Sequence, residues 1–369
     1  MADGSKIEWT DATWNIITGC SIISPGCTNC YAMRLAGTRL RNLPSREGLT
    51  DPSKAGPIWN GQVRFNEQWL EQPVRWKRSR MIFVCAHGDL FHESVPDAWI
   101  DAVFAVMAMA PQHVFQVLTK RTSRMRRYIK TLSKEPADRL HHAAVEAGFT
   151  DEAGCAVANW INGFSRWTTA PPDENPLDGS QPRWPLPNVW LGFSAENQKH
   201  FDERWERVQS LAKDGWNTWL SAEPLLGPID ATPGLYNFPP CDDCPGVDHA
   251  DCCRDPDEAP GLKWIETGGE SGPNARPPHP AWFRTLRDDA AKAGVPFGFK
   301  QWGEWAPEAM HPNAKVVKSV HPTDKARSGV VGSETWNAGM AKVGKKRAGR
   351  ELDGVVHDAF PERAVAEKG

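Results

Sequence analysis

The side chains best suited to inorganic chemistry are three cysteines that lie close together near the start of the chain. Cys20, Cys27 and Cys30 have the spacing C-x6-C-x2-C in the segment GCSIISPGCTNCYA. Zinc normally takes four ligands, and neither a histidine nor a fourth cysteine is nearby in the sequence. A 4Fe-4S cluster held by three thiolates would leave one iron open for a substrate or cofactor. The segment therefore predicts an iron–sulfur site, with a zinc site completed by a distant residue, or three inert thiols, as alternatives.

A second group of cysteines lies in the segment CDDCPGVDHADCC. Cys241, Cys244, Cys252 and Cys253, with His249 between them, fit zinc ligation. The segment has too few apolar residues for a core of its own, so a bound metal would explain its stability. A second iron–sulfur cluster and a flexible loop with incidental thiols are the alternatives.

The remaining cysteines and the composition limit the classes of protein to which the chain could belong. Cys85 and Cys155 stand alone in the sequence, and each is expected to be a small buried residue. The nine cysteines are an odd number in a chain of 369 residues without a secretion signal, which argues against a disulfide framework and for a cytoplasmic protein. The longest apolar run, 102–110, is too short to cross a membrane, so we expect no membrane partner. A net charge of −3 excludes a globally basic coat.

Short apolar segments alternate with amphipathic stretches over most of the chain. Segments such as MIFVCA and NVWLGF are continuous apolar runs, which is typical of strands buried on both faces. This alternation predicts an α/β fold with a parallel (β/α)8-type barrel, complete or open, and an open doubly wound sheet is the alternative. The expected strands are 14–18, 62–65, 81–86, 113–118, 188–193, 218–222, 262–267 and 295–299.

Three segments interrupt this rhythm. We expect a barrel domain over 1–310, with a helical lid at 131–187 and a cysteine-rich loop at 231–261. The Gly- and Lys-rich segment 311–369 has little periodicity and is expected to be an extended C-terminal arm.

Polar residues follow six consecutive expected strands. Ligands of such sheets bind beyond the carboxyl ends of the strands, so these residues should share one site, although single members could be turn residues or helix caps. Glu223, Glu270, Lys300 and Asp89 are the candidate catalytic residues. The whole set is His87, Gly88, Asp89, Thr119, Lys120, Ser194, Glu196, Asn197, Ser221, Glu223, Gly268, Gly269, Glu270, Ser271, Lys300 and Gln301.

Positive charge is concentrated in three places. Basic patches interleaved with tryptophans suit nucleic acid, although solvated helix faces and a tryptophan-rich core explain the same pattern. Trp302 and Trp305, which follow the last expected strand, are candidates for a ligand-facing surface. The patches are Arg75, Lys77, Arg78 and Arg80; Lys120, Arg121, Arg124, Arg126, Arg127 and Lys130; and Lys342, Lys345, Lys346, Arg347 and Arg350.

The cysteine segment after a first strand resembles the radical S-adenosylmethionine superfamily. More closely, the chain is similar to a phage-encoded family of uncharacterised function that is known for its three-cysteine motif. The matching stretches are KIEWTDATWN, GDLFHE, LTKR, WLGFSAEN, LSAEPLLGPID, GGESGPNARP, FKQWGEW and VGKKRAGRELDG, together with the cysteine segment. The superfamily usually has C-x3-C-x2-C spacing and places a Gly-Gly-Glu element after its second strand, whereas here Gly268, Gly269 and Glu270 follow about the seventh.

The resemblance implies a 4Fe-4S cluster on the three cysteines that cleaves S-adenosylmethionine reductively. It implies that the cofactor is bound by strand-end residues, which here would be Gly268, Gly269, Glu270, Ser194 and Glu196, with Tyr31 beside the last cysteine.

The leading hypothesis is therefore a radical enzyme that acts on a nucleotide or nucleic acid, for modification or repair, with an electron-donor protein as partner. The alternative is a zinc-stabilised nucleic-acid-binding protein or nuclease of phage origin.

Overall fold

A computed structural model describes residues 4–5, 7–158, 184–236, 261–322 and 337–361. Its centre is a seven-stranded sheet in which every neighbouring pair is parallel and the strands follow one another in chain order. This sheet and its flanking helices form an open α/β barrel, which confirms the expected fold class. The strands, in order, are β1 (Ala12–Trp14), β6 (Met81–Val84), β7 (Val114–Thr119), β8 (Val189–Ser194), β9 (Asn217–Ala222), β10 (Leu262–Gly268) and β11 (Phe297–Gln301).

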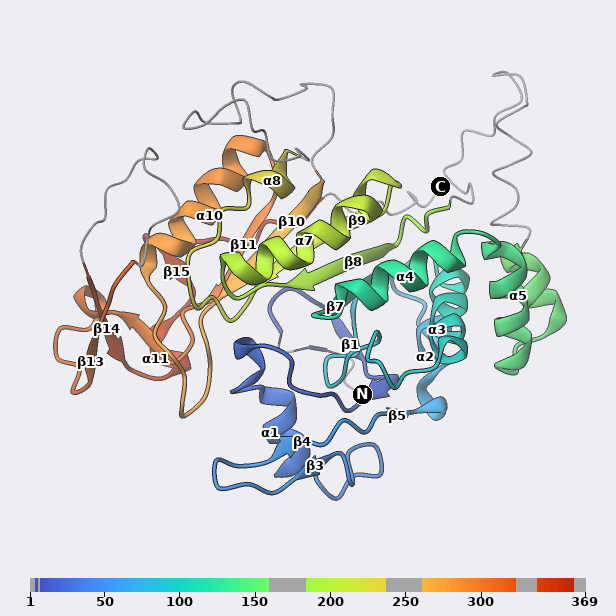
Figure 1. The fold of residues 1–369 in the computed structure, drawn as a ribbon, viewed down its shortest axis with the longest axis horizontal. Coiled ribbons are helices and arrows are strands. Elements are labelled where there is room, and N and C mark those ends of the chain that lie inside the picture. Colours follow the sequence, from blue (N-terminus) through green and yellow to red (C-terminus); the bar gives the residue numbers. More distant parts are fainter. Residues whose placement is uncertain (1–3, 6, 159–183, 237–260, 323–336, 362–369) are drawn as a thin grey trace.

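The helices that connect these strands lie alongside the sheet (Figure 1). They are α3 (Asp97–Met109), α4 (Thr122–Leu132), α7 (Gln198–Lys213), α8 (Thr232–Leu235) and α10 (Pro280–Ala293). Their apolar faces and one face of the sheet form the main core. Helix α10 has Pro280 in its first turn, and Gly294, the residue that follows it, is in the left-handed region that favours glycine.

Tryptophans fill the other face of the sheet. Trp9, from the segment before β1, contacts Phe83, Trp219 and Trp264 with ring centroids 4.7–6.0 Å apart. Trp219 and Trp264 stack on each other at 4.8 Å. These rings form a second, smaller core. The tryptophan-rich composition therefore serves packing here, which was the alternative to base stacking.

Two of the expected strands do not join the sheet as predicted. β1 ends at Trp14, and the next residues, β2 (Ile17–Thr18), pair instead with β5 (Arg64–Phe65) in a separate antiparallel ribbon. Asn66 holds this ribbon to the end of β1, since its side-chain amide donates to the carbonyls of Asn15 and Ile16. Because 62–65 is used in the ribbon, the sheet has seven strands.

The segments outside the barrel are mostly short. In the expected lid region, the structure has α5 (Pro136–Glu146) and a helical segment at 151–158. Residues 159–183 of that region and the second cysteine group lie outside the described residues. The C-terminal region contains short strands, and Phe299 of β11 donates its N–H to the His357 carbonyl, so the chain covers this edge of the sheet.

No helix in the described ranges is long and apolar enough to span a membrane. The other elements are η1 (Pro25–Cys27), α1 (Tyr31–Gly37), β3 (Thr50–Asp51), β4 (Ile58–Trp59), η2 (Glu67–Trp69), α2 (Gln72–Arg75), β12 (Trp305–Pro307), η4 (Glu308–Met310), β13 (Val317–Val320), β14 (Ala338–Lys342), α11 (Lys345–Ala348), β15 (Glu351–Leu352) and β16 (Val355–Val356).

Candidate active site at the mouth of the sheet

A cavity of about 470 Å³ lies at the carboxyl ends of the strands. It is lined by residues at or just beyond the carboxyl ends of β6, β7, β8, β9, β10 and β11, where the strand-end pattern predicted them, and by all three cysteines of the N-terminal segment. Of the predicted site residues, these line it: Cys20, Cys27, Cys30, Tyr31, Asp89, Ser194, Glu223, Gly269, Glu270 and Lys300. Gly268 and Glu196 lie directly behind the lining residues, Gly268 beside Glu223 and Glu196 against Gly26. The predicted ligands Cys241, Cys244, Cys252 and Cys253 lie outside the described residues.

The three cysteines are partly buried and come from one short stretch of backbone. Cys20 follows β2, Cys27 ends η1, and Cys30 is the residue before α1. Burial raises the pKa of the Cys20 thiol to about 12, helped by Asp89 and opposed by Arg121. Burial also raises the pKa of the Cys30 thiol, although the backbone N–H groups of Met33 and Ala32 are hydrogen-bonded to its sulfur and oppose the rise.

Asp89 holds an arginine against the first cysteine. The guanidinium of Arg121 donates to Asp89 Oδ2 at 2.9 Å and to Cys20 Sγ at 3.5 Å. Asp89 also accepts the Thr119 hydroxyl at 2.7 Å. Arg121 and Asp89 are almost fully buried, and Arg121 also pairs at 2.7 Å with Glu93, a more exposed carboxylate, so two carboxylates compensate its charge. Asp89 therefore acts on the cysteine segment through Arg121.

Glu196 supports the segment next to the second cysteine. Its carboxylate accepts the backbone N–H of Gly26 at 3.1 Å and an N–H of Arg204 at 2.8 Å. Burial alone would raise the pKa of Glu196, but Arg204 and Lys120 outweigh burial and lower it to about 2. Gly26 needs its missing side chain here, since a Cβ would lie 3.2 Å from the Glu196 carboxyl carbon.

Glu270 supports the segment next to the third cysteine. It accepts the side-chain amide of Asn29 at 3.0 Å and both the backbone N–H and the guanidinium of Arg276. Arg276 also donates to the Pro25 carbonyl at 2.9 Å. Glu270 is therefore saturated with donors from the protein.

Glu223 and Lys300 form a pair that faces the cavity. Lys300 Nζ donates to both carboxylate oxygens of Glu223, at 2.8 and 2.9 Å. Burial would lower the pKa of Lys300, but Glu223 outweighs it and raises that pKa. Behind this pair, burial and the negative charge of Glu223 raise the pKa of Glu266 well above its usual range.

The paired glycines at the end of β10 differ in what surrounds them. A Cβ on Gly269 would overlap the backbone carbonyl of Trp302, so this position is needed for backbone packing. A Cβ on Gly268 would lie 3.4 Å from Glu223 Oε1, which is close to an ordinary contact. Tyr31 donates its hydroxyl to the Ala86 carbonyl at 2.6 Å, which ties α1 to the end of β6.

The expectation that two tryptophans form a ligand-facing surface is wrong. Trp302 and Trp305 are only 2% exposed, and their indole N–H groups donate to the carbonyls of Glu351 and Ala275. In the α4 patch, Arg121 is buried, and both Arg124 and Lys130 pair with aspartates. Half of that patch is therefore neutralised within the protein.

The sequence did not identify Arg204, Arg276 or Asn29 as site residues. Arg204 lies in the middle of an amphipathic helix, where its sequence position gives no sign of its partner. Asn29 and Arg276 do lie inside stretches that carry the family resemblance, namely TNC and GPNARP, so their positions next to Cys30 and after Glu270 were the available signal.

The chain belongs to the family described as "Protein of unknown function (DUF5131)", whose model matches residues 4–361. No curated protein gives a significant match to its sequence. Among solved structures, a cysteine-to-serine mutant of spore photoproduct lyase is similar at 10% identity and a TM-score of 0.35, over 92% of this chain and 71% of that one.

Proposed function

We propose that this chain is an iron–sulfur enzyme of the radical S-adenosylmethionine type, with a 4Fe-4S cluster on Cys20, Cys27 and Cys30. The observation that carries the proposal is that each cysteine, or a residue next to it, is held from a different strand end. Asp89 acts on Cys20 through Arg121, Glu196 binds the backbone beside Cys27, and Glu270 binds the side chain beside Cys30.

The surroundings of the sulfurs suit a cluster. Arg121 donates to Cys20, Ser24 Oγ lies 3.8 Å from Cys27 Sγ, and backbone N–H groups face Cys30. Hydrogen bonds to sulfur are among the features that set the potential of iron–sulfur clusters. These donors would stabilise thiolates that burial otherwise disfavours.

The separation of the sulfurs favours a cluster over one zinc ion. Thiolates that share a zinc ion lie roughly 3.8 Å apart, given Zn–S bonds of about 2.3 Å in a tetrahedron. Within the part of the chain that the structure describes, the sulfurs of Cys20, Cys27 and Cys30 do not all lie within 4.8 Å of one another. A group of several metal atoms accommodates such wider spacing.

The remaining cavity residues would bind the organic cofactor and the substrate. When bound, cluster and S-adenosylmethionine would supply a carbon radical that abstracts hydrogen. Glu223 is the carboxylate best placed to accept N–H or O–H groups, because it lines the cavity and, among the described residues, its hydrogen-bond donor is Lys300. The hydroxyls of Ser194 and Ser221 line the same wall.

We propose a nucleotide or nucleic acid as the substrate. Arg34 and Lys120 line the cavity at its cysteine side, where positive charge suits a phosphate. An electron-donor protein would be the partner, since reductive cleavage needs an electron from outside.

Anaerobic reconstitution with iron and sulfide tests the proposal. We expect about four iron atoms per chain at this site, the visible absorption of a cluster, and cleavage of S-adenosylmethionine on reduction. Cys27→Ala should lose that iron, while Cys155→Ser, a substitution outside the cavity, should retain it. Equal iron in wild type and Cys27→Ala would overturn the assignment, and zinc without iron would favour a zinc-stabilised protein.

A further inference from the structure

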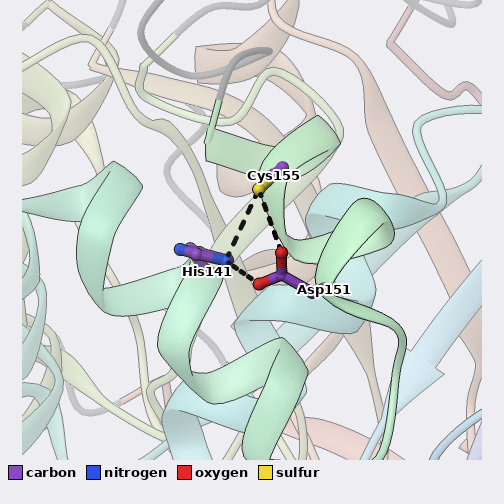
Figure 2. Close-up of side chains that lie close together, drawn as sticks. All are labelled: His141, Asp151 and Cys155. Atoms are coloured by element: carbon purple, nitrogen blue, oxygen red, sulfur yellow. Dashed lines mark hydrogen bonds and ion pairs between the residues drawn. The ribbon is translucent and has the colours of Figure 1, made fainter.

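Three further side chains of the kinds that bind metals lie on the helices that follow α4, away from the cavity. Figure 2 shows His141, Asp151 and Cys155 pointing toward one another. His141 Nε2 lies 3.2 Å from Asp151 Oδ1, and Cys155 Sγ lies 3.8 Å from both His141 Nε2 and Asp151 Oδ2. Among the described residues, these three side chains form a group whose ligand atoms all lie within 4.8 Å of one another. Cys155 is exposed, so the expectation that it is buried is wrong.

The arrangement differs from that of a nucleophile activated by a histidine. In such a triad the cysteine and the carboxylate use opposite ring nitrogens of the histidine. Here both contact the same nitrogen, Nε2 of His141. One nitrogen cannot donate its single proton to both groups, whereas three atoms that converge on one point can share a cation.

The distances and the charges suit zinc. Nitrogen, oxygen and sulfur ligands of a tetrahedral zinc lie roughly 3.3 to 3.6 Å apart, given bonds of about 2.0 to 2.3 Å. The observed distances of 3.2 and 3.8 Å need only small side-chain adjustments to match. A thiolate, a carboxylate and a neutral imidazole together carry the charge that a divalent cation balances, and this mixture of soft and borderline ligands selects zinc over magnesium or calcium.

The backbone is shaped to let these groups meet. Asp151 and Cys155 are four residues apart in the helical segment 151–158, so they share one face of it. Gly154, which is part of that segment, packs against α5, and a Cβ on it would overlap the His141 ring and lie 3.0 Å from Val145 Cγ2. The missing side chain allows the imidazole to approach the other two ligands.

We infer that His141, Asp151 and Cys155 form a zinc-binding site with three protein ligands, which joins α5 to the segment 151–158. The fourth position is open to water or to another ligand, since Asp151 is 79% exposed. This site is independent of the cysteine segment at the cavity.

Zinc protection of Cys155 tests the site in the full-length chain. The rate of Cys155 alkylation is measured by peptide mass spectrometry with and without stoichiometric zinc, which separates this thiol from all other cysteines. We expect zinc to slow alkylation by about ten-fold or more, because a metal-bound thiolate is withdrawn from reaction. His141→Ala and Asp151→Asn should abolish the protection. His142→Ala removes the adjacent histidine, which faces Glu146, and should leave the protection unchanged.

Two results would overturn the inference. One is an alkylation rate of Cys155 that does not respond to zinc in the wild-type chain. The other is equal protection in wild type and His141→Ala, because zinc would then bind the thiol without the converging imidazole. Gly154→Ala provides a check that removes no ligand, and we expect it to weaken protection because the His141 ring is displaced.

Discussion

The cysteine segment at the cavity and the trio on the outer helices are built in opposite ways. At the cavity, the ligands come from eleven consecutive residues, and buried carboxylates from three strand ends hold them in place. In the outer trio, the ligands come from two packed helical segments and contact mainly one another. The comparison indicates that the first site depends on a network of surrounding charges, while the second depends on a bound ion. Substitutions that remove a surrounding group should therefore be costly at the first site and nearly silent at the second.

The largest expected effect is at Asp89. Asp89→Asn leaves the buried guanidinium of Arg121 with Glu93, an exposed carboxylate, as its remaining charged partner, and breaking the buried pair should cost about 3 to 4 kcal/mol. Urea denaturation of the metal-free chain measures the free energy of unfolding. Asp97→Asn is the matched control, since its pair with Arg124 involves a half-exposed aspartate and should be worth less than about 1 kcal/mol. Equal effects of the two substitutions would contradict the contrast between the buried network and exposed pairs.

The next effect depends on pH and concerns Glu196. The folded state lowers the pKa of this carboxyl to about 2, so its ionised form contributes stability above the ordinary pKa of about 4.5. That contribution, about 3 kcal/mol, is lost as pH falls from 4.5 through 2. Glu196→Gln should therefore be less stable than wild type at about pH 7, and the difference should shrink in acid. Unfolding free energies across this range measure it, and a difference that does not change with pH would rule out the charge of Glu196 as its cause.

The glycines after β10 give a third, smaller effect. Gly269→Ala should destabilise the chain by about 2 kcal/mol, because the new methyl group meets the Trp302 carbonyl and the backbone must shift. Gly268→Ala should cost less than about 1 kcal/mol, since its nearest contact is a carboxylate oxygen at 3.4 Å. Thermal unfolding compares the two. The reverse order would mean that Gly268 is the position that the packing of the mouth requires.

The sequence predicted the residues that line the cavity more completely than the residues that hold them in place. Continuous apolar runs gave the parallel strands, and the carboxyl ends of such strands necessarily meet at one edge, which is why Asp89, Glu223 and Lys300 line one cavity. The arginines that neutralise the carboxylates come from distant or helical positions, such as Arg204, whose partner is decided by helix packing. Trp302 was misassigned for a similar reason, because residues near Glu351 fold back to cover it.

The outer trio was missed because its spacing has no recognisable pattern. His141 lies ten residues before Asp151, and the turn between α5 and the following helical segment determines whether they face each other. An isolated cysteine in an amphipathic stretch predicts burial, and only the tertiary packing shows that Cys155 points outward. Local spacing identifies ligands from one loop, but not ligands from two helices.

The smallest expected effect concerns Cys155 in the outer trio. Cys155→Ala in the metal-free chain should change the free energy of unfolding by less than about 0.5 kcal/mol, because the thiol is exposed and its contacts at 3.8 Å are weak. With excess zinc, the wild-type chain should become more stable than Cys155→Ala, since a ligand bound only by the folded state stabilises it. Parallel urea titrations with and without zinc measure both quantities. A large loss in the metal-free variant would show that the trio is held by its own hydrogen bonds, and the two regions would then be built alike.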